Sequence, residues 1–218
     1  MVMFDSRKEA AQALARELSA YRGQHPLVLA IPRGAVEMAC IIAEQLDGEA
    51  DVVLVKKLGA PGNPEFAVGA VDETGWMWIA DHAAQVGATA DYLALERRRQ
   101  RERLNQRRKL YTPDRPPIDA GGRTVIVVDD GMATGATMMA ALHAISVQGP
   151  ARLVCAVPVA SEEAVQQVQT HADRLVCLQV PRFFQAVGSF YRDFPQLDDA
   201  QVIQLLAAVR PTPGTPPS

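Results

Sequence analysis

The sequence predicts an α/β fold: a parallel sheet flanked by helices, with a small hood or flap lobe. Short apolar runs without polar alternation are separated by helical patterns along most of the chain. Strands of that kind are buried on both faces, which is typical of a parallel sheet covered by helices. With 218 residues, of which 48% are hydrophobic and 22% charged, the chain suits one soluble domain over 1–210.

The first part of the chain begins with an amphipathic helix. Ser6 and Glu9 form a capping-box pattern, and apolar residues recur at helical spacing as far as Tyr21. The run "PLVLAIPRG" then predicts a buried strand that Pro and Gly terminate. A helix is predicted over 36–46 and a second buried strand over 51–55.

The middle of the chain departs from this alternation. Residues 56–67, "KKLGAPGNPEFA", contain too much Gly and Pro to be regular throughout. Residues 68–80 resemble two short strands joined by a turn at 73–75. A long helix is predicted over 91–111, and the prolines of the linker 112–122 prevent it from continuing.

The last part of the chain again alternates strands with helices. The predicted strands are 124–128, 152–160 and 174–180, and the predicted helices are 137–147, 161–171 and 198–209. Residues 180–197, called the hood segment below, are partly aromatic. Residues 211–218 have too few apolar side chains to order themselves, so we expect a disordered tail.

Three polar stretches follow the first three predicted strands. They are "PRGA" after the first, "KK" after the second and "DDGMATGAT" after the third. Because ligands of open parallel sheets bind beyond the carboxyl ends of the strands, we expect these stretches to converge.

The third stretch has the composition of an anion site. Its small residues leave the backbone accessible, and a helix begins near Thr137, so amide groups and a positive dipole end face the loop. Asp129 and Asp130 would repel a phosphate if they pointed at it, but they suit the vicinal hydroxyls of the same ligand. A ribose 5-phosphate unit has that shape. An isolated Asp-Asp-Gly is more often a plain turn, and the continuation into Thr-Gly-Ala-Thr favours the ligand site.

The segment "VIVVDDGMATGAT" resembles the phosphoribosyl pyrophosphate (PRPP) signature of type I phosphoribosyltransferases. The resemblance extends from about residue 4 to residue 209. "IPRGA", "KKLGAPGNPEFAVGAV" and "AVGSFYRDF" are similar to motifs of a bacterial subgroup of that family. The family resemblance implies a pentosyltransferase of nucleotide metabolism, which transfers the phosphoribosyl group of PRPP to a nitrogenous base and releases pyrophosphate.

The resemblance also implies roles for individual residues. Arg33, Lys56, Asp129 and Asp130 are the candidates for catalysis. The residues implied to bind PRPP are Arg33, Gly34, Lys56, Asp129, Asp130, Gly131, Met132, Ala133, Thr134, Gly135, Ala136 and Thr137. The implied cofactor is Mg²⁺, which arrives mainly with PRPP; no protein ligand is assigned directly, and Asp129 and Asp130 are the candidates.

Residues 32–34, called the PRG loop below, correspond to the pyrophosphate loop, where family members commonly have a non-proline cis peptide. Ala35 stands where the subgroup pattern has a second glycine, so a left-handed conformation there would cost about 1 kcal/mol.

Two further segments are implied to act on the substrates. Gly59, Asn63 and Glu65 belong to a candidate lid that excludes water from the site, and the alternative is an inert connector. Phe183, Phe184, Phe190 and Tyr191 are candidates for stacking on the base, although such residues more often fill the core of a small lobe.

The segment 96–109 is strongly basic. It holds eight basic and two acidic residues, a charge of +6, so the rest of a chain with a net charge of −3 carries −9. A solvated, salt-bridged or subunit-facing helix explains this charge. The alternative function is a PRPP- or nucleotide-sensing regulator that binds RNA or a protein through this helix. The negative net charge counts against nucleic acid as a partner.

Three other expectations concern the setting of the protein. Cys40, Cys155 and Cys177 are widely separated, which predicts neither a disulfide framework nor a zinc site. No apolar run is long enough for a membrane span, and the start lacks the apolar stretch of a signal peptide, so we expect a cytoplasmic protein. A homodimer is a further expectation.

Overall fold

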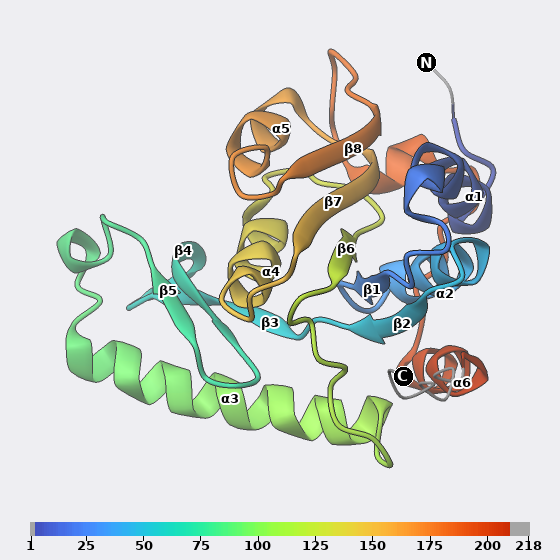
Figure 1. The fold of residues 1–218 in the computed structure, drawn as a ribbon. Coiled ribbons are helices and arrows are strands. Elements are labelled where there is room, and N and C mark those ends of the chain that lie inside the picture. The colour runs from blue at the N-terminus through green and yellow to red at the C-terminus, as the bar shows by residue number, and fades with distance from the viewer. Residues whose placement is uncertain (1–2, 210–218) are drawn as a thin grey trace.

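The structure is a computed structural model that describes residues 3–209 (Figure 1). The α-helices are α1 (Arg7–Glu17), α2 (Ala35–Gln45), α3 (Ala90–Tyr111), α4 (Ala136–Ser146), α5 (Glu162–Val168) and α6 (Asp199–Ala208). The strands are β1 (Leu27–Ala30), β2 (Glu49–Val52), β3 (Val55–Ala60), β4 (Asn63–Asp72), β5 (Met77–Ile79), β6 (Thr124–Val128), β7 (Arg152–Val159) and β8 (Arg174–Gln179). Short 3₁₀ helices occupy Ser19–Tyr21, Ala84–Val86 and Val187–Phe190.

The central sheet has five strands in the order β2-β1-β6-β7-β8, and every neighbouring pair is parallel. Figure 1 shows α1 and α2 on one side of this sheet and α4 and α5 on the other. Successive strand residues alternate between two apolar layers: Val28 and Val128 face α1 and α2, whereas Leu29 and Val127 face α4 and α5. The apolar runs lack polar alternation because both faces are covered. The predicted fold class is confirmed.

A separate three-stranded antiparallel ribbon, β3-β4-β5, extends from the end of β2. The irregular part of 56–67 is shorter than predicted, because β3 and β4 flank a tight turn at 61–62. Gly62 has φ +75° in this turn, and Pro64 is the second residue of β4, beyond the part of β4 that pairs with β5. A β-bulge near Gly59 takes up the irregularity: a Cβ on Gly59 would lie 2.4 Å from the carbonyl oxygen of Pro64. Glycine and proline are therefore compatible with strand structure here.

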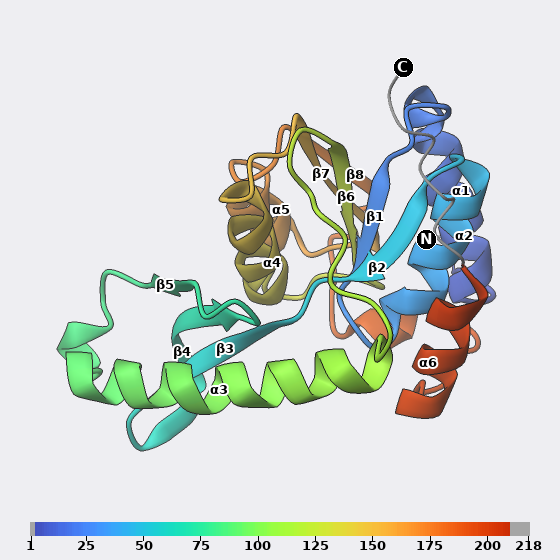
Figure 2. The same cartoon turned by 60° about the horizontal axis from the view of Figure 1, so that its bottom comes forward.

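Helix α3 lies along the ribbon and reaches α6 at its carboxyl end, as Figure 2 shows. The observed bounds of the helices differ from the predicted ones by a few residues. Helix α1 ends at Glu17, and a 3₁₀ turn continues the chain to Tyr21. Ser161 and Asp198 are N-caps rather than helical residues, because their side chains accept backbone N–H groups of the first turn.

The predicted tail, 211–218, lies outside the described residues. Within residues 3–209 no helix combines the length and the apolar character that a membrane span requires.

Candidate functional site

Two of the three polar stretches meet at one edge of the central sheet. Strands β1 and β6 are parallel neighbours, so the PRG loop and the segment 129–135 leave the sheet side by side. The backbone N–H of Ile31 donates to the carbonyl of Val128 at 2.9 Å, which joins the bases of these two segments. The third stretch is displaced: Lys56 and Lys57 lie within β3 of the ribbon instead of directly at the end of β2.

Asp129 and Asp130 differ in their surroundings, although they are adjacent. The Oδ1 atom of Asp129 accepts the backbone N–H of Asp130 at 2.8 Å. The Oδ2 atom of Asp130 accepts from the guanidinium of Arg7, whose Nε and Nη2 atoms each lie 2.9 Å from it. One carboxylate is thus ion-paired within the protein, whereas the other, among the described residues, is bonded to the backbone of its neighbour.

Arg7 is a site residue that the sequence analysis missed. It opens α1 and is only 6% exposed. The apolar residues Ala10 and Leu14 of the same helix are fully buried, three and seven positions further along. A charged residue on the apolar face of an amphipathic helix was the available signal, because such a residue needs a buried partner.

Burial acts on the charges of the two aspartates. It raises the pKa of Asp129 well above its ordinary value, and the adjacent charge of Asp130 adds to this rise. The pKa of Asp130 is also raised by burial, while Arg7 opposes that rise. Burial therefore disfavours the charged forms of both carboxylates, and the pKa values are perturbed in the way that is common at ligand sites.

The PRG loop approaches Asp130 so closely that only glycine fits at position 34. A Cβ on Gly34 would lie 2.1 Å from Oδ2 of Asp130 and 3.0 Å from the guanidinium of Arg7. The peptide bond between Pro32 and Arg33 is cis, as the family resemblance implied. Ala35 is the first residue of α2 and is not among the described residues with positive φ, so the strain considered for it does not arise.

The segment after the two aspartates is fixed to the end of β7. The N–H of Met132 donates to the carbonyl of Val159, and the hydroxyl of Ser161 donates to the carbonyl of Ala133 at 2.6 Å. Gly131 is closely packed, since a Cβ there would lie 2.6 Å from Val187. These contacts hold the loop in one conformation.

The same loop presents the amino-terminal end of α4. Gly135 precedes the helix with φ +71°, a conformation that glycine adopts without strain. The first bond of the i→i−4 pattern runs from the N–H of Met139 to the carbonyl of Gly135, so the N–H groups before it have no intrahelical partner. Thr134 is exposed and Thr137 is half-buried beside them. The arrangement can bind a phosphate monoester.

The two predicted cations of the site have different positions in the structure. The Nη1 atom of Arg33 lies 3.9 Å from Oδ1 of Asp199 in the first turn of α6. The hydroxyl of Tyr111 also donates to Oδ1 of Asp199, at 2.7 Å. Burial, followed by this hydrogen bond, raises the pKa of Tyr111 to about 12. Lys56 is exposed on the ribbon.

The candidate lid residues lie on the hairpin formed by β3 and β4. Gly59 belongs to β3, Asn63 begins β4, and Glu65 follows within β4. The lid candidate is therefore a strand hairpin rather than an irregular loop.

The four aromatic candidates for base stacking have different exposures. Phe190 and Tyr191 are 1% and 5% exposed, so a ligand cannot stack on them in this conformation. Phe184 is half-buried and stacks on Phe190 with ring centroids 5.3 Å apart. Phe183 is 86% exposed and is the one of the four whose ring is free.

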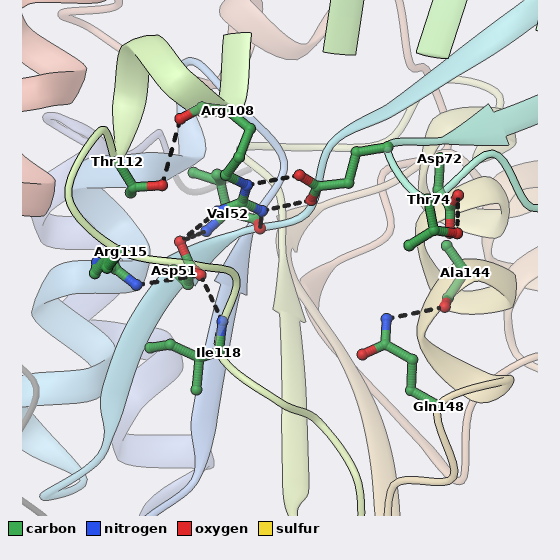
Figure 3. A network of polar contacts seen from close by, with 11 residues as sticks. Asp51, Val52, Asp72, Thr74, Arg108, Thr112, Arg115, Ile118, Ala144 and Gln148 are labelled. Carbon is green, nitrogen blue, oxygen red and sulfur yellow. Dashed lines mark hydrogen bonds and ion pairs between the residues drawn. The ribbon is translucent and has the colours of Figure 1, made fainter. Parts of the chain in front are cut away.

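The basic helix α3 has a buried anchor as well as exposed charges. Figure 3 shows Arg108 donating to Asp51 and to the carbonyl of Val52, at 2.8 and 2.7 Å. Arg108 also makes a two-point ion pair with Glu73 of the turn between β4 and β5. Burial opposes the charge of Arg108, but the bonds to Glu73 and Asp51 outweigh it and raise the pKa. Arg108 thus fastens α3 and the ribbon to β2.

Metal ligands are sparse in this part of the fold. Within the described residues no group of three or more His, Cys, Asp or Glu side chains is placed to hold a metal ion. Cys40, Cys155 and Cys177 carry free thiols, in line with the prediction that they form no disulfide.

Nearly the whole chain is similar in sequence to known proteins. A family model described as "Phosphoribosyl transferase domain" matches residues 4–195. Two curated proteins of Mycobacterium tuberculosis are each 38% identical over 208 residues, which is 94% of this chain and 47% of the relative. They are named "Putative phosphoribosyl transferase MT0597" (strain CDC 1551 / Oshkosh) and "Putative phosphoribosyl transferase Rv0571c" (strain ATCC 25618 / H37Rv). The chain spans about half the length of these relatives.

A solved structure covers the chain more evenly. The protein TT1426 from Thermus thermophilus is 45% identical to this chain and superposes with a TM-score of 0.87, over 95% of this chain and 99% of that one. The family match includes the PRG loop, the two aspartates and the loop before α4. Since the match spans most of the residues and contains the motifs assembled at this edge of the sheet, the chain belongs to the phosphoribosyl transferase domain family.

Proposed function

We propose that this domain transfers the 5-phosphoribosyl group of PRPP to a nitrogenous base and releases pyrophosphate in a reaction that depends on Mg²⁺. The observation that carries the proposal is the meeting of two loops at one sheet edge. The two aspartates and the amino-terminal end of α4 lie on one loop, and the PRG loop packs directly against Asp130.

The ligand is oriented by the difference between the two ends of its ribose 5-phosphate unit. The 5-phosphate faces the amides before Met139 and the hydroxyls of Thr134 and Thr137, where the N–H of Ala136 makes a long contact, 3.5 Å, to Oγ1 of Thr134. The ribose diol faces the carboxylates, which gain donors that replace the hydration lost on burial. This orientation keeps the anionic phosphate away from the carboxylates.

Catalysis rests on charge stabilisation of the leaving group. Pyrophosphate departs from C1 with its negative charge, through an oxocarbenium-like state, and the base attacks with a ring nitrogen. Arg33 and Lys56 supply positive charge to the pyrophosphate. Arg33 reaches it by leaving Asp199, whose contact with Arg33 is long and half-exposed.

The donor set fits Mg²⁺ bound mainly through the substrate. The two adjacent carboxylates suit Mg²⁺, which commonly combines one or two carboxylates with phosphate oxygens and water. Asp129 and Asp130 would hold it on the protein side. When bound, Mg²⁺ neutralises part of the charge that develops on the pyrophosphate.

The base is expected beside the hood segment. A cavity of about 380 Å³ adjoins the exposed ring of Phe183. Its lining consists of Gln179, Val180, Pro181, Arg182 and Phe183. Closure of the hairpin that carries Gly59, Asn63 and Glu65 would exclude water from the reacting centre.

The experiment is an assay of pyrophosphate release with PRPP, Mg²⁺ and a panel of purines, pyrimidines and related heterocycles. We expect turnover with at least one base and its loss on removal of Mg²⁺ with EDTA. The double variant Asp129→Asn/Asp130→Asn should lose PRPP affinity and remain folded. The double variant Glu44→Gln/Asp47→Asn removes the same charge at the other end of α2 and should behave as the wild type.

Two results would contradict the proposal. Tight PRPP binding without turnover of any base would point to a binding protein rather than an enzyme. Wild-type PRPP affinity in the folded double aspartate variant would remove the assignment of the diol to these carboxylates.

The alternative, a PRPP- or nucleotide-sensing regulator, depends on the exposed arginines of α3. If it holds, neutralising Arg97, Arg98 and Arg101 abolishes binding of an RNA or protein partner and spares PRPP binding. None of the relatives described above is named as a regulator. A cytoplasmic location and a homodimer stay predictions.

A further inference from the structure

Arg7 is buried at the site but takes no part in the reaction proposed above. Its Nε and Nη2 atoms engage Oδ2 of Asp130, and its Nη1 atom donates to the carbonyl of Pro195 at 2.7 Å. The guanidinium also lies over the ring of Phe194, 3.8 Å from its centroid. One side chain from α1 therefore contacts both the end of β6 and the hood segment.

The hood segment is tied to Asp130 from a second direction. The hydroxyl of Tyr191 donates to the backbone carbonyl of Asp130 at 2.6 Å. The ring of Tyr191 stacks on that of Phe194, with centroids 4.8 Å apart, and also packs against Phe4. Side chains of α1 and of the hood segment thus contact the same aspartate, which follows β6.

The PRG loop packs against the same aspartate. The backbone at Gly34 lies so near to Oδ2 of Asp130 and to Arg7 that a methyl group has no space. Asp130 therefore has its carboxylate fixed by Arg7, its carbonyl fixed by Tyr191, and the PRG loop packed against it. A carboxylate held in this way keeps one orientation before a ligand binds.

We propose that Arg7 is a positioning residue of the phosphoribosyl site: it fixes Asp130 and holds residues 187–195 of the hood segment against the segment 129–135. Asp130 is then the carboxylate that Arg7 holds in a fixed orientation, whereas Asp129 accepts the N–H of Asp130. The two adjacent acids therefore differ in the partners that position them.

The charge of Arg7 serves the same purpose. Two carboxylates without a cation would repel an anionic ligand, and the positive charge of Arg7 offsets part of this repulsion. Because Arg7 is buried, water screens this effect weakly. The inference rests on the proposed function, since it names the roles of residues within that ligand site.

The test compares Arg7→Gln, Arg7→Lys, Asp130→Asn and Asp129→Asn with the control Arg16→Gln, an exposed arginine of the same helix. Ribose 5-phosphate, without metal, is titrated calorimetrically into each protein. Hydrogen exchange of residues 187–195 is measured in the absence of any ligand. The exchange measurement needs no ligand. It therefore tests whether Arg7 holds the hood segment even if the proposed function is wrong.

We expect Arg7→Gln to weaken ribose 5-phosphate binding by about tenfold or more and to speed exchange in 187–195, because a charge-assisted contact is lost. Arg7→Lys should be intermediate between Arg7→Gln and the wild type in affinity and in exchange rate. Asp130→Asn should speed the exchange, whereas Asp129→Asn should lose affinity with exchange unchanged. Arg16→Gln should match the wild type in both measurements.

The proposal fails if folded Arg7→Gln binds ribose 5-phosphate as the wild type does, or if its exchange in 187–195 is unchanged. If Arg7→Gln does not fold, Arg7→Lys and Asp130→Asn decide by the same two readouts. A wild-type protein that binds no ribose 5-phosphate would overturn the proposed function, and the exchange data would still decide whether Arg7 fastens the hood.

Discussion

The guanidinium of Arg33 lies 3.9 Å from the carboxylate of Asp199, so the cation of the PRG loop faces the first turn of α6 instead of the loop before α4. The side chain of Arg33 is 41% exposed and that of Asp199 is 38% exposed. A diphosphate that binds at the PRG loop has to compete with Asp199 for Arg33.

Removing this competitor should strengthen diphosphate binding. We expect Asp199→Asn to raise the affinity for inorganic pyrophosphate by about two- to fivefold, the range of a weak, half-exposed ion pair. Isothermal titration calorimetry checks the change, and Glu44→Gln on α2 controls for net charge. Equal or weaker binding in Asp199→Asn would show that Asp199 does not restrain Arg33.

A change at position 34 should damage the site without removing a charged group. Gly34→Ala would place a methyl group 2.1 Å from Oδ2 of Asp130. Because both neighbours are fixed, the PRG loop or Asp130 has to shift, and we expect PRPP affinity to fall about tenfold or more. Gly121→Ala, whose nearest contact would be an ordinary 3.4 Å, is the matched control. Unchanged affinity in Gly34→Ala would contradict the close approach.

Arg108 should matter for folding rather than for ligand binding. Arg108→Met removes the 2.8 Å contact to the buried carboxylate of Asp51, which is 1% exposed and keeps only the longer ion pair with Arg115, at 3.3 Å. We expect the free energy of unfolding to fall by about 3 kcal/mol, as for other broken buried ion pairs. Denaturation in urea measures it, with exposed Arg103→Met on the same helix as the control. A loss no larger than that of Arg103→Met would assign Arg108 no structural role.

Substitutions of the aromatic residues in the hood segment should affect either stability or base binding, depending on whether the ring is buried or exposed. Phe183→Ala removes an exposed ring, so we expect stability to change by less than about 0.5 kcal/mol while the affinity for the base falls. Phe190→Ala removes a fully buried ring and should cost about 3 kcal/mol or more. Thermal unfolding and base titration in the presence of pyrophosphate test both variants. Normal base affinity in Phe183→Ala would exclude stacking on this ring.

His143 of α4 should make stability depend on pH. It stacks on Trp78 of β5 and lies near His171, with ring centroids 5.8 and 4.6 Å away. Burial, and next the charge of His171, lowers the pKa of His143 below 6.5, so the unfolded chain takes up this proton at higher pH than the folded one. Stability contributed by His143 is thus present above pH 6.5 and is lost as the pH falls through the lowered value.

Urea denaturation at about pH 5 and pH 7.5 checks this dependence. His143→Phe keeps an aromatic ring but cannot titrate, so it should lose less stability on acidification than the wild type. Identical losses in both proteins would rule out His143 as a source of the dependence.

Local patterns along the chain are enough to define the sheet and to identify the ligand loop. Apolar strands and helical repeats fix the alternation of β and α that a buried parallel sheet requires. The small residues between Gly131 and Thr137 are equally local, because a phosphate loop is made of backbone at one strand–helix junction. The PRG loop is recognisable in the same way.

The side chains that meet across the site could not be paired from such patterns. Arg7 and Asp130 are 123 positions apart, and no spacing in the sequence links them. The same holds for Arg33 with Asp199, for the burial of Phe190 and Tyr191, and for the place of Lys56 on a ribbon. A residue pattern states which face of an element is buried, but the partner on that face is chosen by how distant elements pack, and packing is a property of the whole chain.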